Sequence, residues 1–292
     1  MRKIVLRLTA FLIYIFVIFS VHALNWPSEN AVLVRNFGSN DRGLPVLGMV
    51  FSGGTDVLAA ESGEIIFSRK KSDKASRLPS PLGAWTAIDH RDGLISIYSR
   101  YAEPVKPVTE VQVEKQHVIA SSGISGWSAQ NGFYFMLFDR RERRWINPAM
   151  IITPARETRA PQILSVDLKN AQGGLLMQSR SLTQGRYKVI VNAAGGTPYV
   201  QNAAVRQYAP QRIVCLINGT EASSLNFEAV SARDGVLMVY RNGLVSAKQI
   251  YSGFPAFEAA EVFLTRGQVT MEIIVQDLSG VNRSVVNRLI IN

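Results

Sequence analysis

The feature that most restricts the fold of this 292-residue chain is the absence of a sustained helical period after residue 24. Short runs of β-branched and aromatic residues alternate instead with Gly, Pro, Asn and Asp. Such runs favour strands and the residues between them favour turns, so the pattern predicts an all-β protein. In the first half the expected strands are residues 31–36, 55–59, 63–69, 85–90, 95–101, 110–113, 117–120 and 133–139. In the second half they are residues 162–168, 175–181, 186–192, 211–218, 225–232, 236–240, 261–265, 269–276 and 284–291.

Turn dipeptides support this reading, because two-residue hairpin loops prefer Asn-Gly and Asp-Gly. They occur at Asp92-Gly93, Asn218-Gly219, Asp234-Gly235 and Asn242-Gly243. The chain is long enough for about two domains. The segment 151–161 has two prolines, mixed charge and no pattern, which is typical of a linker. We therefore expect domains at residues 24–152 and 161–292, joined by a linker at 153–160.

The first 23 residues have the pattern of a secretory signal. Arg2, Lys3 and Arg7 precede an apolar run at residues 8–20, and Val21-His22-Ala23 is the expected cleavage site. An uncleaved N-terminal anchor is the alternative, and only then do we expect membrane attachment. No cysteine stands directly after the apolar run, which excludes a bacterial lipoprotein anchor. The protein is expected to be exported to the periplasm of a bacterial cell envelope.

Export changes what the basic charge implies. Removing Arg2, Lys3 and Arg7, with no acidic residue, lowers the formal charge from +10 to +7. An exported basic protein seldom meets nucleic acid, so none is expected as a partner. Anionic wall polymer, phospholipid headgroups or an acidic protein are the expected counterparts.

The chain is poor in cysteine and histidine. Its one cysteine, Cys215, excludes an intramolecular disulfide and a zinc site built from thiolates. Of its three histidines, His22 leaves with the signal, so only His90 and His117 remain. Few imidazoles leave little room for a histidine-rich metal site.

Five fragments of the first half resemble the LytM or lysostaphin-type zinc endopeptidases of peptidoglycan. They occur in the family's order over about residues 35 to 150. The fragments are Gly54-Thr55-Asp56-Val57-Leu58-Ala59, the hairpin at residues 87–98 around His90 and Asp92-Gly93, residues 108–118, Gly123-Ile124-Ser125-Gly126-Trp127-Ser128, and Trp145-Ile146-Asn147-Pro148. The resemblance implies a LytM-like duplicated hybrid motif, a β-sheet or barrel.

The family's chemistry needs a zinc ion that lowers the pKa of a bound water and polarises the scissile carbonyl. The resemblance places the family's H-x-x-x-D at Leu44 and Gly48, the His of Y-x-H at Arg100, and H-x-H at Phe133 and Phe135. None of these five residues can bind zinc or act as a general base. The resemblance therefore implies a pseudoenzyme with no catalytic residue, no metal and no cofactor.

One alternative is a metallopeptidase whose ligands have moved. It would need His90 and His117 together with a carboxylate. A satisfied strand histidine is the simpler interpretation of His90, and an exposed position is the simpler one for His117, which follows a charged run.

The replacements themselves predict an apolar groove. Phe133 and Phe135 alternate with Tyr134 on one strand, so they share a face, with Arg100 at its edge. This region is either filled core or a recognition surface, where aromatic residues and arginine are favoured anchors.

A basic cluster, Arg140, Arg141, Arg143 and Arg144, precedes Trp145. It is either a solvated hairpin loop or a rim that binds carboxylates or phosphates through guanidinium groups.

The second half is similar to the β-sandwich appended to some exported LytM-type proteins. The fragments that carry this likeness begin at Gly185, Arg212 and Gly267. Frequent strands and turns over about 130 residues are typical of an immunoglobulin-like sandwich.

Degenerate members of the family act as activators or scaffolds for peptidoglycan hydrolases. The resemblance thus implies a non-catalytic envelope protein that binds or regulates such a hydrolase, or binds peptidoglycan itself.

Overall fold

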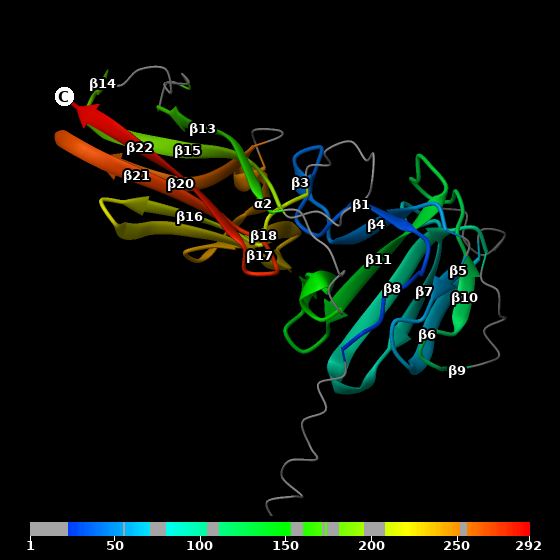
Figure 1. Ribbon diagram of the computed structural model, residues 1–292. Coiled ribbons are helices and arrows are strands. Elements are labelled where there is room, and N and C mark those ends of the chain that lie inside the picture. Colours follow the sequence, from blue (N-terminus) through cyan, green and yellow to red (C-terminus); the bar gives the residue numbers. More distant parts are fainter. Residues whose placement is uncertain are drawn as a thin grey trace, which may run out of the picture.

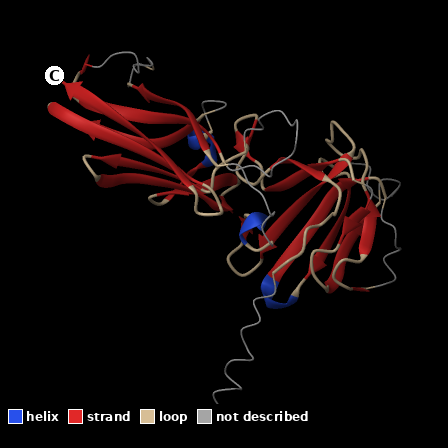
Figure 2. Cartoon of the chain, in the orientation of Figure 1, coloured by secondary structure: helices blue, strands red, loops and turns tan. Residues whose placement is uncertain are grey.

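The computed structural model describes residues 23–54, 56–70, 80–103, 111–152, 160–170, 173, 181–195, 208–251 and 256–292. Strands make up most of these ranges (Figures 1 and 2). Residues 1–22 of the expected signal and 153–159 of the expected linker lie outside the described residues. In the part of the chain that the structure describes, no helix is long and apolar enough to cross a membrane.

An open, mainly antiparallel sheet forms the first half. Its strand order is β1 (Val32–Arg35), β4 (Gly48–Ser52), β11 (Gly132–Asp139), β8 (Leu94–Tyr101), β7 (Ala84–Asp89), β6 (Gly63–Arg69) and β9 (Gln112–Val113). Two small pairs accompany it, β2 (Asn40–Asp41) with β3 (Leu44–Pro45), and β5 (Asp56–Leu58) with β10 (Val118–Ser121). The described strands do not close on themselves, so the sheet is not a barrel.

Burial of one face of this sheet forms the first core. Phe51, Tyr98, Phe133 and Phe135 pack there with Val57 of β5 and with other buried residues of the same cluster. Leu24, just after the expected cleavage site, is also buried in this cluster. Its backbone donates a hydrogen bond to the carbonyl of Ile151 at 3.0 Å. The start of the expected mature chain is therefore part of the fold.

Two facing sheets form the second half, a β-sandwich. The larger sheet contains β14 (Ser181–Leu182), β22 (Asn282–Ile291), β21 (Gly267–Gln276), β16 (Arg212–Ile217), β17 (Thr220–Arg233), β18 (Val236–Arg241) and β19 (Leu244–Ser246). The smaller contains β13 (Gln162–Lys169), β15 (Gly185–Ala194) and β20 (Phe257–Leu264). On β21, every second side chain from Val269 to Val275 is buried in the core between the sheets.

The turn dipeptides take the backbone conformation that their sequences predict. Asn218 and Gly219 have φ values of 50° and 80° between β16 and β17. Asp234 and Gly235 have φ values of 50° and 75° between β17 and β18. Positive φ at both central residues matches the twist of a tight hairpin, which explains the preference for Asn-Gly and Asp-Gly here.

A short strand, β12 (Arg144–Ile146), joins the two halves into one continuous sheet. It pairs with β11 on one side and with β17 on the other. Asn147 adds two bonds across the junction, since its backbone N–H donates to Glu228 and its Nδ2 donates to Phe227. Phe37, from the first half, is fully buried in the second core. The two halves therefore share both a sheet and a core.

Candidate ligand-binding face

The family resemblance aligns Leu44, Gly48, Arg100, Phe133 and Phe135 with the residues that bind the metal or act in catalysis in the peptidases. Leu44 lies on β3 with its side chain 48% exposed, and Gly48 begins β4. Gly48 pairs with Met136 of β11. Arg100 lies near the end of β8, next to Tyr134. Gly48 and Arg100 thus both adjoin one stretch of β11, centred on Tyr134 and Met136.

The backbone at Gly48 leaves no space for a side chain. A Cβ atom on this residue would lie 2.1 Å from the carbonyl oxygen of Phe135 and 2.7 Å from Cγ of Met136. The first of these is a backbone atom inside the sheet and cannot move aside cheaply. A carboxylate, which the family has at this position, does not fit between β4 and β11 as they pair here.

Phe133 and Phe135 lie in the core and do not line a groove with Arg100. Their side chains are 1% and 0% exposed. Phe133 stacks on Phe51 with ring centroids 4.7 Å apart, and Phe135 packs against Tyr98 at 5.1 Å. Of the two interpretations of this region, filled core holds for these two rings, because they point to the face opposite Arg100.

The face that Arg100 shares is filled by Tyr134 and Met136, the residues one position further along β11. Both are buried with Val46 in a separate small cluster, against which Leu82 and Trp145 pack. The Tyr134 hydroxyl accepts a hydrogen bond from the backbone N–H of Leu47 at 2.8 Å. Burial raises the pKa of Tyr134 well above its usual value, so the phenol stays protonated. Tyr134 and Met136 therefore lie on the face where the family resemblance had placed Phe133 and Phe135 as replacements of the two metal-site histidines.

Arg100 brings a charged group to this face. It is an extra residue in β8, since Ala84 pairs with Tyr101 and Trp85 pairs with Ser99. Its φ is 65°, and its guanidinium carbon lies 4.8 Å from the centroid of the Tyr134 ring. Nε is buried without a hydrogen-bond partner. Burial lowers the pKa of Arg100, and the opposing influences of Tyr134 and Asp41 do not restore it.

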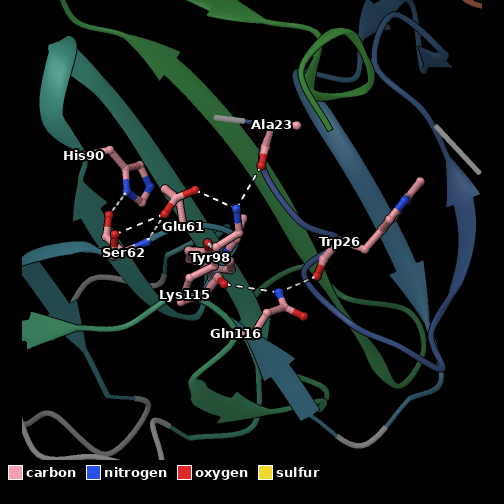
Figure 3. Close-up of polar contacts among 10 residues, drawn as sticks. Ala23, Trp26, Glu61, Ser62, His90, Tyr98, Lys115 and Gln116 are labelled. Atoms are coloured by element: carbon pink, nitrogen blue, oxygen red, sulfur yellow. Dashed lines mark hydrogen bonds and ion pairs between the residues drawn. The ribbon is translucent and has the colours of Figure 1, made fainter. Parts of the chain in front are cut away.

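The two remaining histidines are not brought together with a carboxylate into a metal site. The Nδ1 atom of His90 lies 2.8 Å from the carbonyl oxygen of Ser62 (Figure 3). Its Nε2 atom lies 2.8 Å from Oγ of Ser96. A carbonyl only accepts, so Nδ1 carries the proton and Nε2 accepts from the Ser96 hydroxyl. Both ring nitrogens are therefore engaged. Among the described residues no group of three His, Cys, Asp or Glu side chains is arranged to hold a metal ion.

Beside His90, Lys115 links the N-terminal segment to the first domain. Its Nζ donates to the carbonyl of Ala23 at 2.9 Å and to Glu61 at 2.8 Å (Figure 3). Burial would raise the pKa of Glu61, but hydrogen bonds from Lys115 and Ser62 outweigh it and lower this pKa. These polar groups are satisfied by one another, which is the arrangement of a structural contact.

His90 gives the fold a pH dependence in the range where histidines titrate. Burial lowers its pKa below the usual value of 6.5, against the smaller effects of the Ser62 hydrogen bond and nearby carboxylates. The unfolded chain therefore takes up this proton first, and stability falls as pH drops from about 7 to about 5. Urea unfolding at both pH values should show a smaller difference for His90→Gln than for the wild type. His117→Gln is the matched control, and equal pH dependence in all three proteins would contradict the assignment.

Most of the basic cluster is neutralised within the molecule. Arg140 pairs with Asp89 at 2.9 Å, Arg141 with Asp92 at 3.5 Å, and Arg144 with Asp139 at 3.8 Å. Arg143 lies in the turn between β11 and β12 with a φ of 53°. Three of the four residues expected as a rim thus have acidic partners, two at the turn between β7 and β8 and one in the β11–β12 hairpin itself.

Two exposed apolar residues of the first domain were not expected as site residues. Ile124 and Trp127 have exposed fractions of 60% and 73% in the loop between β10 and β11. The loop is fixed to residues 81–83, because the N–H of Trp127 donates to Pro81 and Gly126 lies directly against Gly83. The N–H of Arg100 donates to Leu82 in the same segment. The sequence signal was the tryptophan in a glycine-bounded loop, where burial is not expected.

Comparison with known families agrees with the residues that carry the resemblance. A family model described as peptidase family M23 matches residues 47–148. A second family model, which carries no description, matches residues 160–292. A search of curated proteins finds no match.

Solved structures similar to this chain include the catalytic domain of the prophage-encoded M23 protein EnpA from Enterococcus faecalis. It is 17% identical with a TM-score of 0.36, over 43% of this chain and 94% of that one. A SpoIIQ–SpoIIIAH pore-forming complex matches at 23% identity and a TM-score of 0.37, over 46% and 92%. Lysostaphin from Staphylococcus simulans matches at 14% and 0.34, over 75% and 86%. Likenesses at these scores carry no conclusion about function. The family match, which spans the segment containing most of the motif fragments, identifies residues 47–148 as a LytM-type domain of peptidase family M23.

Proposed function

We propose that this protein is an exported, non-catalytic relative of the M23 peptidases that acts by binding in the bacterial cell envelope. Its partner would be a peptidoglycan hydrolase or peptidoglycan itself. The observation that carries the proposal is the filling of the former metal face. Gly48 has no room for a carboxylate, and Tyr134 and Met136 occupy the space where ligands would converge.

Binding is the activity that this face can perform. Tyr134 and Met136 close its floor, so a ligand would contact the Arg100 guanidinium and the exposed loop around Trp127. Aromatic residues and arginine are the side chains that most often dominate binding energy. The immunoglobulin-like second half would position this face, or extend it, without chemistry of its own.

Export and the choice of partner rest on the sequence. Residues 1–23 have the signal pattern, and the mature charge of +7 suits anionic wall polymer or an acidic envelope protein. The burial of Leu24 supports this arrangement, because the first residue of the expected mature chain packs into the core.

The competing proposal is a metallopeptidase with relocated ligands, and a metal assay separates the two. Purified mature protein, residues 24–292, should contain no stoichiometric zinc and should not digest peptidoglycan. His90→Ala and His117→Ala variants should therefore change neither result. Stoichiometric zinc, together with wall-degrading activity that either variant abolishes, would overturn the proposal.

A retention assay tests the binding role directly. Immobilised mature protein should retain a hydrolase or peptidoglycan fragments from an envelope extract of the same bacterium. A double variant, Ile124→Ser with Trp127→Ser, should lose most of this retention while keeping its circular dichroism spectrum. Equal retention by the double variant would show that another surface binds.

A further inference from the structure

Arg100 is held in a conformation that glycine would adopt at less cost. It is the unpaired residue of a β-bulge, with Ser99 and Tyr101 on either side fully buried. Its φ of 65° lies in the left-handed region, which is unfavourable for residues with a Cβ atom. Bulges of this kind re-aim a side chain and are frequent beside active sites. The bulge directs the Arg100 side chain onto the Tyr134 ring.

The Arg100 guanidinium lacks a counter-ion among the described residues. Its Nε is buried without a partner, and its described contact is the face of the Tyr134 ring. Asp41, the acidic residue with an electrostatic influence on it, is bound to Arg35 at 2.8 Å. The residue as a whole is only half-buried, and no described acidic side chain forms an ion pair with it, so the terminal nitrogens of the guanidinium have unused capacity for an anion.

Two exposed apolar residues, Ile124 and Trp127, connect to Arg100 through one backbone segment. Ile124 and Trp127 lie on a loop fixed to residues 81–83, the segment to which the Arg100 backbone is also bonded. A small inorganic anion would contact the guanidinium alone. A peptide would also cover these apolar side chains, so the combination favours a peptide.

We propose that Arg100, supported by the Tyr134 ring, binds the terminal carboxylate of a peptide whose side chains pack on Ile124 and Trp127. A carboxylate matches the planar fork of a guanidinium and accepts two parallel hydrogen bonds from it. The proposal rests on the binding role proposed above and names the ligand group for it. Binding here involves no bond making or breaking.

Peptide titration of the mature protein tests this assignment. The probe is acetylated tri-alanine with a free carboxyl end, compared with the same peptide as its amide, followed by NMR chemical-shift changes. The free acid should bind at least about tenfold more tightly than the amide, since a hydrogen bond to a charged group contributes that much. Resonances of residues 81–83 and 123–128 should shift.

Variants of Arg100 test whether the affinity depends on the guanidinium group or only on a positive charge. Arg100→Gln should lose at least about tenfold of the affinity for the free acid, and Arg100→Lys should keep only part of it. Arg233→Gln, the same charge change on an exposed residue of β17, should leave the affinity unchanged. The acid-to-amide comparison in the wild type needs no variant, so it decides the question even where Arg100→Gln folds poorly.

Three results would overturn the assignment. They are equal affinity for acid and amide, unchanged affinity in folded Arg100→Gln, and inorganic phosphate displacing the peptide at equal concentration. None of these results would contradict the proposed binding role in the cell envelope, provided that the protein still retains its partner in the retention assay. Stoichiometric zinc with peptidoglycan digestion would instead remove the proposed function itself.

Discussion

Replacing Gly48 by Asp, the residue that the peptidase family has there, should disrupt the fold and should not create a metal site. A Cβ atom would lie 2.1 Å from the Phe135 carbonyl oxygen, so β4 and β11 would have to separate. We expect a loss of at least about 3 kcal/mol in the free energy of unfolding, in the range of severe core substitutions. Urea denaturation followed by circular dichroism would measure it.

Gly185 provides the matched control for this prediction. A Cβ atom on Gly185 would find its nearest neighbour 4.0 Å away, at the Tyr187 ring. Gly185→Ala should therefore change stability by no more than about 0.5 kcal/mol, whereas Gly48→Ala should already be severely destabilising. The combined variant Leu44→His with Gly48→Asp should bind no zinc. A folded variant that bound one zinc ion would show that this face can still open.

Substituting Glu258 should strongly destabilise the second domain. Its side chain on β20 is 2% exposed and pairs with Lys188 at 2.9 Å and Arg241 at 3.0 Å. Gln249 donates a further hydrogen bond at 3.1 Å. Removing one partner of a buried ion pair leaves the other charge unpaired, so Glu258→Ala should cost about 3–5 kcal/mol.

The control is Glu261, three residues along the same strand. Its pair with Arg186 is exposed and 3.7 Å long, so Glu261→Ala should change stability by less than about 1 kcal/mol. Burial would raise the pKa of Glu258, but its hydrogen bonds outweigh burial and lower this pKa. Its contribution is therefore present at neutral pH and is lost in acid. Equal losses for both variants at pH 7 would contradict a buried network.

Strand positions were predictable where β-branched and aromatic residues gather in one run. β6 and β11 lie within a residue of their expected bounds, and the β16–β17 and β17–β18 hairpins turn at their Asn-Gly and Asp-Gly dipeptides. β4 was missed because Gly48–Ser52 is short and begins with glycine, which weakens a strand signal. β12 was missed because its three residues follow a run of arginines. Its pairing depends on β17, some eighty residues later, which no local pattern reports.

The candidate site was predictable in identity but not in detail. The prediction that this site lacks metal ligands followed from residue types alone. The sequence did not predict on which face Phe133 and Phe135 lie. An alignment error of one residue along a strand moves every side chain to the opposite face. Arg100 was found as a replacement for a histidine. Its bulge, which sets where the guanidinium points, depends on pairing with β7 and leaves no trace in the sequence.

The strand β12 decides how this protein can be taken apart. A fragment ending near residue 152 would keep β12 but lose β17, so a row of backbone N–H and C=O groups would be left open to solvent. Unpaired edges of this kind recruit other chains and promote aggregation. The same cut would strip the cover from Phe37, which is buried in the second core. Binding experiments with either half alone would therefore expose an open strand edge and apolar side chains that are covered in the intact chain, and these surfaces could bind proteins nonspecifically.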